Sequence, residues 1–391
     1  MANENSIWND GLLAGASEAG IVTYEDYGTP DIHEKEVQTL VESNYSVKVE
    51  RLEELVSCVD QNFYVVAKCT TGKNAEFVLK ILCLKKSKQP RVVEGMIKCM
   101  LYLNDKSIHA PVPVMRDSGD YVTLYKAEYG YHAVYMLKYI SGMSYSEILQ
   151  PSATMSYNAG SLLGRIDNAL RNFHHNGFEH ENAVFNTDDV KFLQKCLHVI
   201  DNDKRRQLIE EVISVFKEQV IPNIGELRKG IIHGDYNPNN VIVSKNRLQS
   251  RTESDKNVEH VQQDECDIDI AYDINGIVDF GDTQYSYYVN EIAIAIAHFM
   301  MYCNHGDPLA IGKTVLAGYE SYFRLNDFER KVLQVFVATR MANIAVLGSE
   351  QLKTQTTDND YFRKGIQLCW EYLERYGYQL LNTNISMFEK C

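Results

Sequence analysis

The chain has 391 residues, a formal net charge of −14 at pH 7, and 45% apolar and 24% charged residues. These values are typical of a folded chain with room for two lobes, and they argue against a coiled coil or wholesale disorder. The acidic balance also argues against a nucleic-acid partner, because an acidic surface repels phosphates.

The cysteines and the apolar segments predict where the protein works. None of the nine cysteines forms a Cys-x-x-Cys pair, which favours reduced thiols over disulfides. The first 20 residues lack the basic segment and apolar core of a signal peptide. The most apolar stretch, residues 292–302, is about half as long as a membrane span. We therefore expect a soluble cytoplasmic protein without a membrane partner.

The first part of the chain has the patterns of a small sheet. Residues 1–30 are polar and without periodicity, and we expect a flexible extension there. Residues 31–140 predict an amino-terminal lobe, an antiparallel sheet with one main helix that begins at Pro90. The expected elements are a helix at 34–42, strands at 47–52, 63–67, 76–84, 121–125 and 132–139, and a helix at 90–103.

Residues 141–391 have an almost wholly helical pattern, as in residues 159–173, where leucines and isoleucines recur at helical spacing. Two short apolar strands, at 241–243 and 276–278, interrupt the helices. Between them, an acidic insert at about 246–273 is poor in large apolar residues and predicts a solvated hairpin tip. The expected fold is α+β, with a sheet lobe followed by a larger helical lobe.

The strongest motif is His-Gly-Asp at 233–235, followed by Asn240, an apolar strand and then Asp-Phe-Gly at 279–281. Phosphoryl transfer needs an acceptor for the proton of the attacking hydroxyl and two oxygen ligands for magnesium. Asp235 fits the first role, as the catalytic base, and Asn240 and Asp279 fit the second. The arrangement is that of the protein-kinase-like superfold, and the His-Gly-Asp form is typical of its small-molecule kinases.

A lysine and a glutamate upstream are consistent with the same chemistry. Lys80 lies inside the apolar strand 77–82, and Glu94 is the only acidic residue in the helix of that lobe. A strand lysine paired with a helix glutamate would hold the phosphates of a nucleotide. Each residue alone would more often be a surface charge, so the pairing depends on the motifs downstream.

The loop that should cover the phosphates departs from the protein-kinase pattern. Residues 47–67 contain no glycine, and Asp60 and Asn62 stand near the expected first hairpin turn. We expect these side chains and the loop N–H groups to replace the close approach of glycines. An Ala-Pro-Glu signature is also missing after the Asp-Phe-Gly motif, so a protein substrate is not expected.

The chain resembles the hydroxylysine kinases, within the aminoglycoside phosphotransferase and choline kinase-like family. The most specific likeness is the run 276–282 continued by Tyr-x-Tyr-Tyr-Val-x-Glu at 285–291, which kinase chemistry does not require. The relatives carry leucine where this chain has Tyr236, which leaves the shape of the floor beside Asp235 open. The other segments that share the likeness are 41–43, 47–49, 60–63, 76–80, 173–175, 179–182, 232–235 and 316–320.

This resemblance implies transfer of the γ-phosphate of GTP, or of ATP, to the 5-hydroxyl of 5-hydroxy-L-lysine in lysine and hydroxylysine catabolism. It implies Mg²⁺ as the cofactor and a small amino acid and a nucleoside triphosphate as the partners. It also places a hinge at residues 136–140, where Met136 and Tyr139 would contact the purine through backbone groups.

The amino-acid pocket follows from the chemistry of the implied substrate. Two ammonium groups and one carboxylate need acidic side chains and one fixed cation. Asp282 and Glu291 are the candidates for the ammonium groups, Arg340 for the carboxylate, and Tyr288 for the lining. Each could equally be an inter-helix ion pair or a packing residue.

Two other functions stay open on the sequence. One is a kinase of another small hydroxylated amine or amino acid, such as an aminoglycoside, choline, homoserine or fructosamine. The other is an inactive nucleotide-binding scaffold, which would usually lack one of the four motif residues. Lys80, Asp235, Asn240 and Asp279 are all present, which favours an enzyme.

Overall fold

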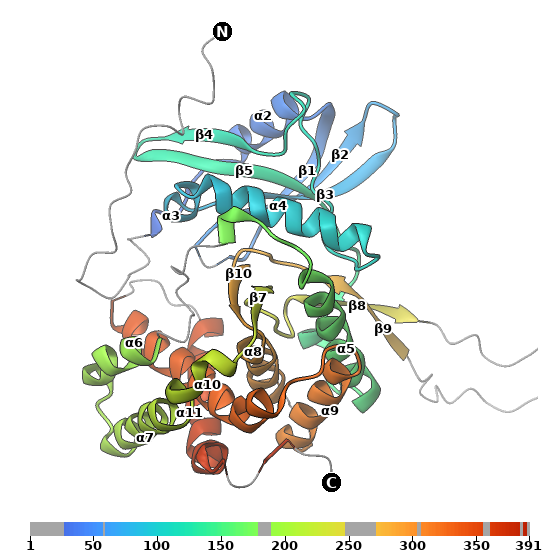
Figure 1. The fold of residues 1–391 in the computed structure, drawn as a ribbon. Coiled ribbons are helices and arrows are strands. Elements are labelled where there is room, and N and C mark those ends of the chain that lie inside the picture. The colour runs from blue at the N-terminus through green and yellow to red at the C-terminus, as the bar shows by residue number, and fades with distance from the viewer. Residues whose placement is uncertain are drawn as a thin grey trace, which may run out of the picture.

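The amino-terminal lobe is a five-stranded antiparallel sheet with the strand order β1-β2-β3-β5-β4 (Figure 1). The computed structural model describes residues 27–57, 59–178, 189–246, 271–302, 306–354, 360–383 and 386–388. The strands of this sheet are β1 (Val47–Leu55), β2 (Gln61–Cys69), β3 (Asn74–Ile81), β4 (Thr123–Ala127) and β5 (Gly130–Lys138). The expected meander is confirmed, although β3 ends earlier than predicted. Most of the expected extension and of the acidic insert lies outside the described residues.

Two helices cover the two faces of this sheet. Helix α2 (Glu34–Asn44) packs on one face, where alternate strand residues such as Phe63 and Leu79 form a core with Val37 and Val41. Helix α4 (Pro90–Asp105) lies on the other face, and the short helix α3 (Leu84–Ser87) precedes it. Because side chains alternate along a strand, the neighbours of the α2-facing residues point toward the helical lobe. Lys80 is one of them.

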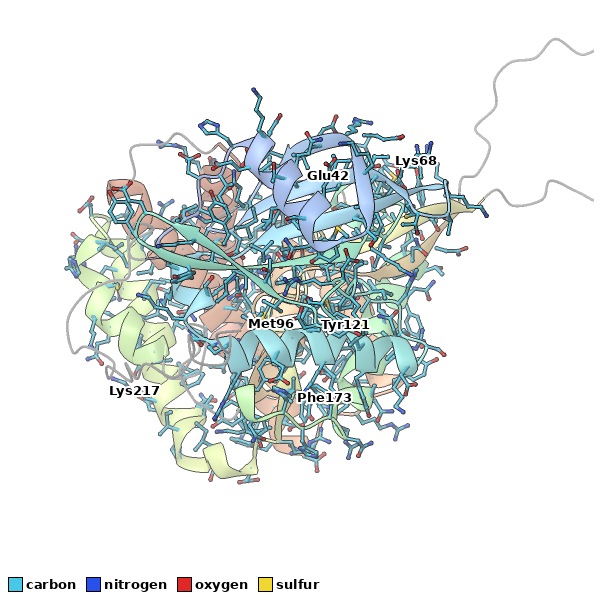
Figure 2. The ribbon with its side chains drawn as sticks, turned by 90° about the horizontal axis from the view of Figure 1, so that it is seen from above. Glu42, Lys68, Met96, Tyr121, Phe173 and Lys217 are labelled. Atoms are coloured by element: carbon cyan, nitrogen blue, oxygen red, sulfur yellow. The ribbon has the colours of Figure 1, made fainter. Side chains whose placement is uncertain are left out.

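Helix α4 also joins the two lobes. Tyr102 lies on α4, and the centroid of its ring is 5.1 Å from that of Phe173, which follows the first long helix of the carboxy-terminal lobe. Figure 2, which looks down on α2 and Glu42, shows α4 with Met96 running between the sheet and the segment of Phe173. Helix α4 thus contacts both lobes.

The carboxy-terminal lobe is mostly helical, as expected, with two small sheets at its contact with the upper lobe (Figure 1). Its helices are α5 (Ala153–Leu170), α6 (Asp189–Cys196), α7 (Asp203–Gln219), α8 (Tyr288–Met301), α9 (Pro308–Glu320), α10 (Asp327–Thr354) and α11 (Asp360–Leu381). Its strands are β6 (Met143–Ser144), β7 (Lys229–Ile232), β8 (Val241–Asn246), β9 (Ala271–Ile277) and β10 (Gln284–Tyr287), paired as β6-β8-β9 and β10-β7. The loops between these short strands carry the motifs.

Glycines let α5 and α9 approach very closely. A Cβ on Gly160 would lie 2.0 Å from the carbonyl oxygen of Val315, and a Cβ on Gly318 would lie 2.0 Å from that of Tyr157. Helix α5 in turn holds the motif loop, because the hydroxyl of the fully buried Tyr236 donates to the carbonyl of Ala159 at 2.7 Å. The residue after the His-Gly-Asp motif is therefore an anchor of the loop.

In the described part of the chain, none of the helices combines the length and the apolar character that crossing a membrane requires.

Candidate active site

His233 connects the two motif segments. Its Nε2–H donates to the carbonyl of Val278 at 3.0 Å, and its Nδ1 accepts from the N–H of Asp235 at 3.3 Å. Burial lowers the pKa of His233 to about 4, so the ring is neutral at pH 7. The histidine supports the loop, and the carboxylate beside it remains the candidate base.

Asn240 holds Asp235 with both hydrogens of its side-chain amide. Its Nδ2 donates to the carbonyl and to Oδ2 of Asp235, both at 2.9 Å. Burial, together with the nearby Asp282 carboxylate, raises the pKa of Asp235 to about 7, and Arg340 opposes this rise. A carboxylate with a pKa near the working pH suits a general base. The side-chain oxygen of Asn240 is left to bind a cation.

Asp279 follows β9 with a φ of 63°, a left-handed conformation that is uncommon for a residue other than glycine. The N–H of Val278 donates to the carbonyl of Asn240 at 2.9 Å, which places the two expected metal ligands on adjacent segments. The Lys80 ammonium bonds to Oδ1 of Asp279 at 2.7 Å and holds the pKa of that carboxyl well below its usual range.

The oxygen pair of Asn240 and Asp279 fits a magnesium ion. Mg²⁺ binds one or two protein oxygens and fills its other positions with water and phosphate oxygens. Across the described ranges, three or more His, Cys, Asp or Glu residues nowhere gather into a ligand cage. A site completed by the nucleotide is therefore the type that these residues can build.

Lys80 stands in a row across three strands. In the register of the sheet, Asn62 on β2 and Tyr135 on β5 are its direct neighbours, so the three side chains point to the same face. Lys80 is 7% exposed, and Oδ1 of Asn62 is buried without a hydrogen-bond partner. The predicted residues Lys80 and Asn62 thus lie together above Asp279.

The expected ion pair between Lys80 and Glu94 is wrong in this structure. Lys80 bonds to Asp279 instead, and Glu94 bonds to Lys98 one turn further along α4 at 2.5 Å. Helix α4 buries Val93, Met96 and Met100 toward the sheet, so Glu94 falls beside this face, and its side chain is 54% exposed. Its second neighbour is His175, at 4.0 Å.

The expected contact of Asp60 with phosphate is also wrong. Asp60, the last residue of the loop between β1 and β2, is buried, and its Oδ1 accepts from the N–H of Cys83 at 2.9 Å. Its Oδ2 accepts from the ammonium of Lys86 at 3.1 Å. The sequence analysis missed Lys86, because nothing in the run 85–88 distinguishes it from the other lysines there.

The hinge residues are only partly available to a purine. Met136 is fully buried against the α2 core, and its carbonyl accepts from the N–H of Val114 at 2.8 Å. This carbonyl is therefore already paired, and a contact of Met136 with a purine stays a prediction. The N–H of Tyr139 likewise donates to the carbonyl of Glu76 at 3.0 Å, but its ring is 37% exposed and meets the edge of Tyr64 at 5.1 Å. The ring is the group that Tyr139 can offer.

Arg340 reaches the catalytic loop from α10. Its Nη2 lies 3.8 Å from Oδ1 of Asp235 and 3.3 Å from Nε2 of His298. Desolvation and the guanidinium lower the pKa of His298, so this histidine is neutral and accepts from Arg340. The sequence analysis missed His298, which lies in the apolar pattern of α8. The predicted cation is therefore beside the base.

Of the predicted acidic residues, Asp282 lies at the site and Glu291 lies behind it. Burial raises the pKa of Asp282, and the nearby Lys86 and Arg340 cations oppose this rise. Glu291 is fully buried, and its Oε2 accepts from the N–H of Gly234 at 2.9 Å. Its expected contact with a substrate ammonium is wrong, because the fully buried carboxyl group holds the loop from inside the lobe.

Tyr288 does not line the site either. It is 4% exposed, and its ring packs on that of Phe323 with 4.6 Å between the centroids. Its hydroxyl fills the space above Gly230, where a Cβ would lie 1.8 Å away. The expected lining role is replaced by packing at the start of α8.

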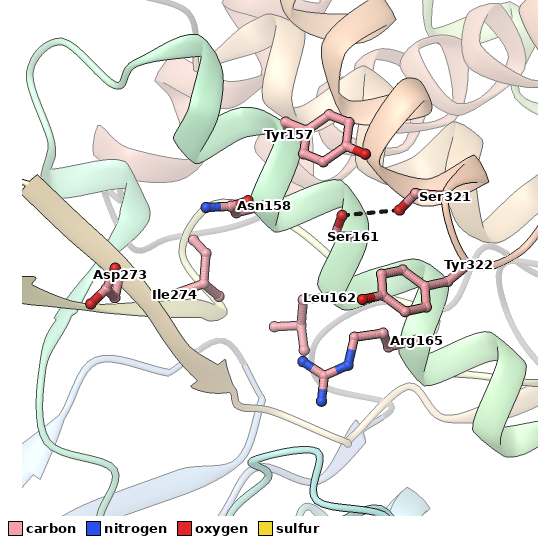
Figure 3. Close-up of a pocket in the computed structure, with 9 residues that line it drawn as sticks. All are labelled: Tyr157, Asn158, Ser161, Leu162, Arg165, Asp273, Ile274, Ser321 and Tyr322. Atoms are coloured by element: carbon pink, nitrogen blue, oxygen red, sulfur yellow. Dashed lines mark hydrogen bonds between the residues drawn. The ribbon is translucent and has the colours of Figure 1, made fainter.

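A separate pocket of about 710 Å³ opens between α5, β9 and the end of α9 (Figure 3). It is lined by Tyr157, Asn158, Ser161, Leu162, Arg165, Asp273, Ile274, Ser321 and Tyr322. A hydrogen bond of 3.2 Å between the hydroxyls of Ser161 and Ser321 crosses its rim. None of the predicted site residues belongs to this pocket.

A two-lobed fold with Asp235, Asn240, Asp279 and Lys80 gathered at the contact between the lobes is the arrangement of a kinase-type phosphotransferase. The solved structure of an amicoumacin kinase in complex with AMP-PNP, Ca²⁺ and amicoumacin has this fold, with a TM-score of 0.61 over 91% of this chain and 95% of its own, at 15% identity. A microcompartment-associated aminopropanol kinase gives a TM-score of 0.63 over 89% of this chain and 100% of its own, at 14% identity.

Sequence comparison narrows the class. The model of the phosphotransferase enzyme family matches residues 60–250. The hydroxylysine kinase of Bos taurus is 30% identical over 358 residues, which are 88% of this chain and 89% of the relative, and that of Danio rerio is 27% identical over 349 residues, 86% and 90%. The chain belongs to the phosphotransferase enzyme family, in the group of the hydroxylysine kinases. It is a small-molecule phosphotransferase that acts on an alcohol group.

Proposed function

We propose that this protein transfers the γ-phosphate of a nucleoside triphosphate, GTP in preference to ATP, to the 5-hydroxyl of 5-hydroxy-L-lysine. The observation that carries this proposal is the position of Arg340, a buried guanidinium beside the base Asp235. An acceptor with both a hydroxyl and a carboxylate can place the first at Asp235 and the second at Arg340. The reaction would be a step of lysine and hydroxylysine catabolism.

Each residue of the site has a separate role in the proposed reaction. Asp235 takes the proton of the attacking hydroxyl, and the fully buried Glu291 and His233 keep the loop in place through Gly234 and Val278. Lys80 moves from Asp279 to the phosphates or bridges both, because its ammonium has three donors. Asn240 and Asp279 would hold Mg²⁺, which neutralises charge on the phosphates when it is bound.

The acceptor pocket supports a zwitterionic substrate. Asp282 lies near Asp235, Lys86 and Arg340, so it is the described acid that an ammonium group of the acceptor can reach. Arg340 presents a planar fork of donors that matches a carboxylate. An acceptor without a carboxylate, such as choline, has no group that matches this fork of donors.

The test is nucleotide turnover by the purified protein with Mg²⁺ and 5-hydroxy-L-lysine, with GTP and ATP compared in parallel. L-lysine, which lacks only the hydroxyl, is the matched control acceptor, and Asp235→Asn is the matched control enzyme. We expect phosphate transfer with hydroxylysine alone, faster with GTP, and lost in the variant. Turnover only with choline, homoserine, fructosamine or an aminoglycoside would contradict the acceptor, and equal rates with ATP would contradict the donor preference.

A further inference from the structure

Lys86 enters the active site from a position outside the kinase motifs. It belongs to α3, the short helix after β3, and its ammonium bonds to Oδ2 of Asp60 at 3.1 Å. The other oxygen of Asp60 accepts from the N–H of Cys83 at 2.9 Å. The side chain of Asp60 is 7% exposed and that of Lys86 is 24% exposed. The carboxylate therefore fixes the ammonium from behind while one side of it stays open.

The open side faces the metal-binding segment. A Cβ built on Gly281 would lie 3.0 Å from Nζ of Lys86 and 3.2 Å from Oδ1 of Asp279. The absence of a side chain at Gly281 thus leaves room for the ammonium next to this carboxylate. Lys80 bonds to the same Oδ1 at 2.7 Å, so two lysines from different elements converge on Asp279.

The charges around Lys86 favour a cation there. Asp60, Asp282 and Asp279 all raise its pKa and overcome the opposing effect of burial, so the side chain is charged at pH 7. A partly buried ammonium that is paired on one side can bind a further anion at little additional cost in desolvation. The polyphosphate of the donor nucleotide is the anion that the neighbouring Asp279 site brings to this place.

The loop between β1 and β2 explains why a second lysine is useful. Residues 56–60 contain no glycine, so the close backbone approach to phosphates that a glycine-rich loop permits is not expected from this sequence. Asp60, which the sequence analysis expected to contact phosphate, instead bonds to Lys86. The loop therefore acts on phosphate through the lysine that its aspartate holds.

We infer that Lys86 is a second phosphate-binding lysine, which contacts the polyphosphate of the donor nucleotide together with Lys80 and is positioned by Asp60. The inference rests on the proposed nucleotide donor, and it does not depend on which alcohol accepts the phosphate.

The experiment is calorimetric binding of a series of four ligands with decreasing phosphate number: a non-hydrolysable GTP analogue, GDP, GMP and guanosine, each with Mg²⁺. For Lys86→Met we expect about 10- to 100-fold weaker binding of the triphosphate, the size of a lost charge-assisted hydrogen bond. Binding of guanosine should stay unchanged. Lys88→Met, an exposed lysine of the same segment, is the matched control and should bind all four ligands like the wild type.

Two further variants separate phosphate binding from a structural role. Lys86→Arg keeps the charge and should restore most of the affinity for the triphosphate. Asp60→Asn should weaken triphosphate binding in the wild type and add nothing in the Lys86→Met background, because Asp60 acts through Lys86. Melting temperatures of all variants show which of them are folded, and Asp60→Asn in the otherwise wild-type protein serves as the test if the methionine variant is not folded.

The outcomes are distinct. An equal loss for guanosine and the triphosphate, or no loss at all, would overturn the role of Lys86 while wild-type binding and turnover leave the proposed function intact. A wild-type protein that binds none of the triphosphates would overturn the proposed function and this inference together. A wild type that binds GTP but phosphorylates another alcohol would contradict only the proposed acceptor.

Discussion

The two walls of the active site are built in different ways. The carboxy-terminal wall takes Asp235, Asn240 and Asp279 from two adjacent loops. The His233 ring joins these loops by donating to the carbonyl of Val278, and the N–H of Val278 donates to the carbonyl of Asn240. The amino-terminal wall takes single side chains from β2, β3 and α3, and their positions depend on strand register and on one buried carboxylate. The difference is that residues on two short adjacent loops are positioned by neighbours close to them in the sequence. The side chains on the sheet and on α3 are positioned by residues far away in the sequence.

The largest effect is expected on the carboxy-terminal wall. Asp235→Asn removes the base but keeps the shape of the loop, so kcat should fall by about 10²- to 10⁴-fold. Nucleotide affinity should change little, because the proposed role of Asp235 is to act on the acceptor and not to bind the nucleotide. Steady-state kinetics and nucleotide binding measure the two quantities. Asp105→Asn, at the exposed end of α4, is the control, and a variant with more than a tenth of the wild-type kcat would rule Asp235 out as the base.

A substitution at Arg340 tests whether helix α10, which lies behind the loop, contributes to substrate binding. Arg340→Lys keeps the charge beside Asp235 and loses the planar fork, so KM for the amino acid should rise about tenfold. KM for the nucleotide should stay within about twofold. Initial rates with each substrate varied in turn give both constants. Equal increases in the two constants would show that Arg340 supports the site as a whole.

Glu291 tests how the same wall depends on pH. Burial raises its pKa to about 8, so the folded state holds a proton that the unfolded chain has already released above its usual pKa of 4.5. Stability should therefore fall as the pH rises from 5 to 8, at no more than about 1.4 kcal/mol per pH unit for this proton. Glu291→Gln keeps an oxygen for the N–H of Gly234 and removes the charge.

Unfolding of wild type and Glu291→Gln in denaturant between pH 5 and pH 8 measures this effect. The variant should gain stability relative to the wild type as the pH rises. A constant difference over this range would mean that Glu291 is ionised in the folded protein and that its contact with Gly234 is an ordinary charge-assisted bond.

The smallest effect is expected where the amino-terminal wall departs from the protein-kinase pattern. Glu94 pairs with Lys98 on an exposed face, so Glu94→Gln should change kcat and nucleotide KM by less than about twofold. In the same assays, kcat of Lys80→Met should be about 100-fold lower than that of the wild type, since the Lys80 ammonium bonds to Asp279. A large loss in Glu94→Gln would mean that the helix turns toward Lys80 when a nucleotide binds.

The periodicity and motifs of the sequence predicted the two-lobed fold correctly, and they predicted the loops on which Asp235, Asn240 and Asp279 come together. The roles of these three residues as base and metal ligands stay predictions. Strand and helix periods reflect burial of each segment on one face, and Asp235, Asn240 and Asp279 lie on loops short enough for the motif to set their geometry. The wrong predictions concern side chains whose direction depends on distant elements. Glu94 and Tyr288 lie on helices that turn them away from the site, and Glu291 lies behind it.

Only the tertiary structure decided which charges meet. Asp60 and Lys86 are 26 residues apart, and their pairing follows from how α3 lies beside the start of β2 within the amino-terminal lobe. Lys80 and Asp279 are 199 residues apart, and their pairing follows from how the sheet sits on the carboxy-terminal lobe. Nothing local distinguishes a lysine that points to solvent from one that points to a carboxylate of the other lobe. The physical reason is that an ion pair is specified by the position of both partners, and a sequence pattern describes the surroundings of only one.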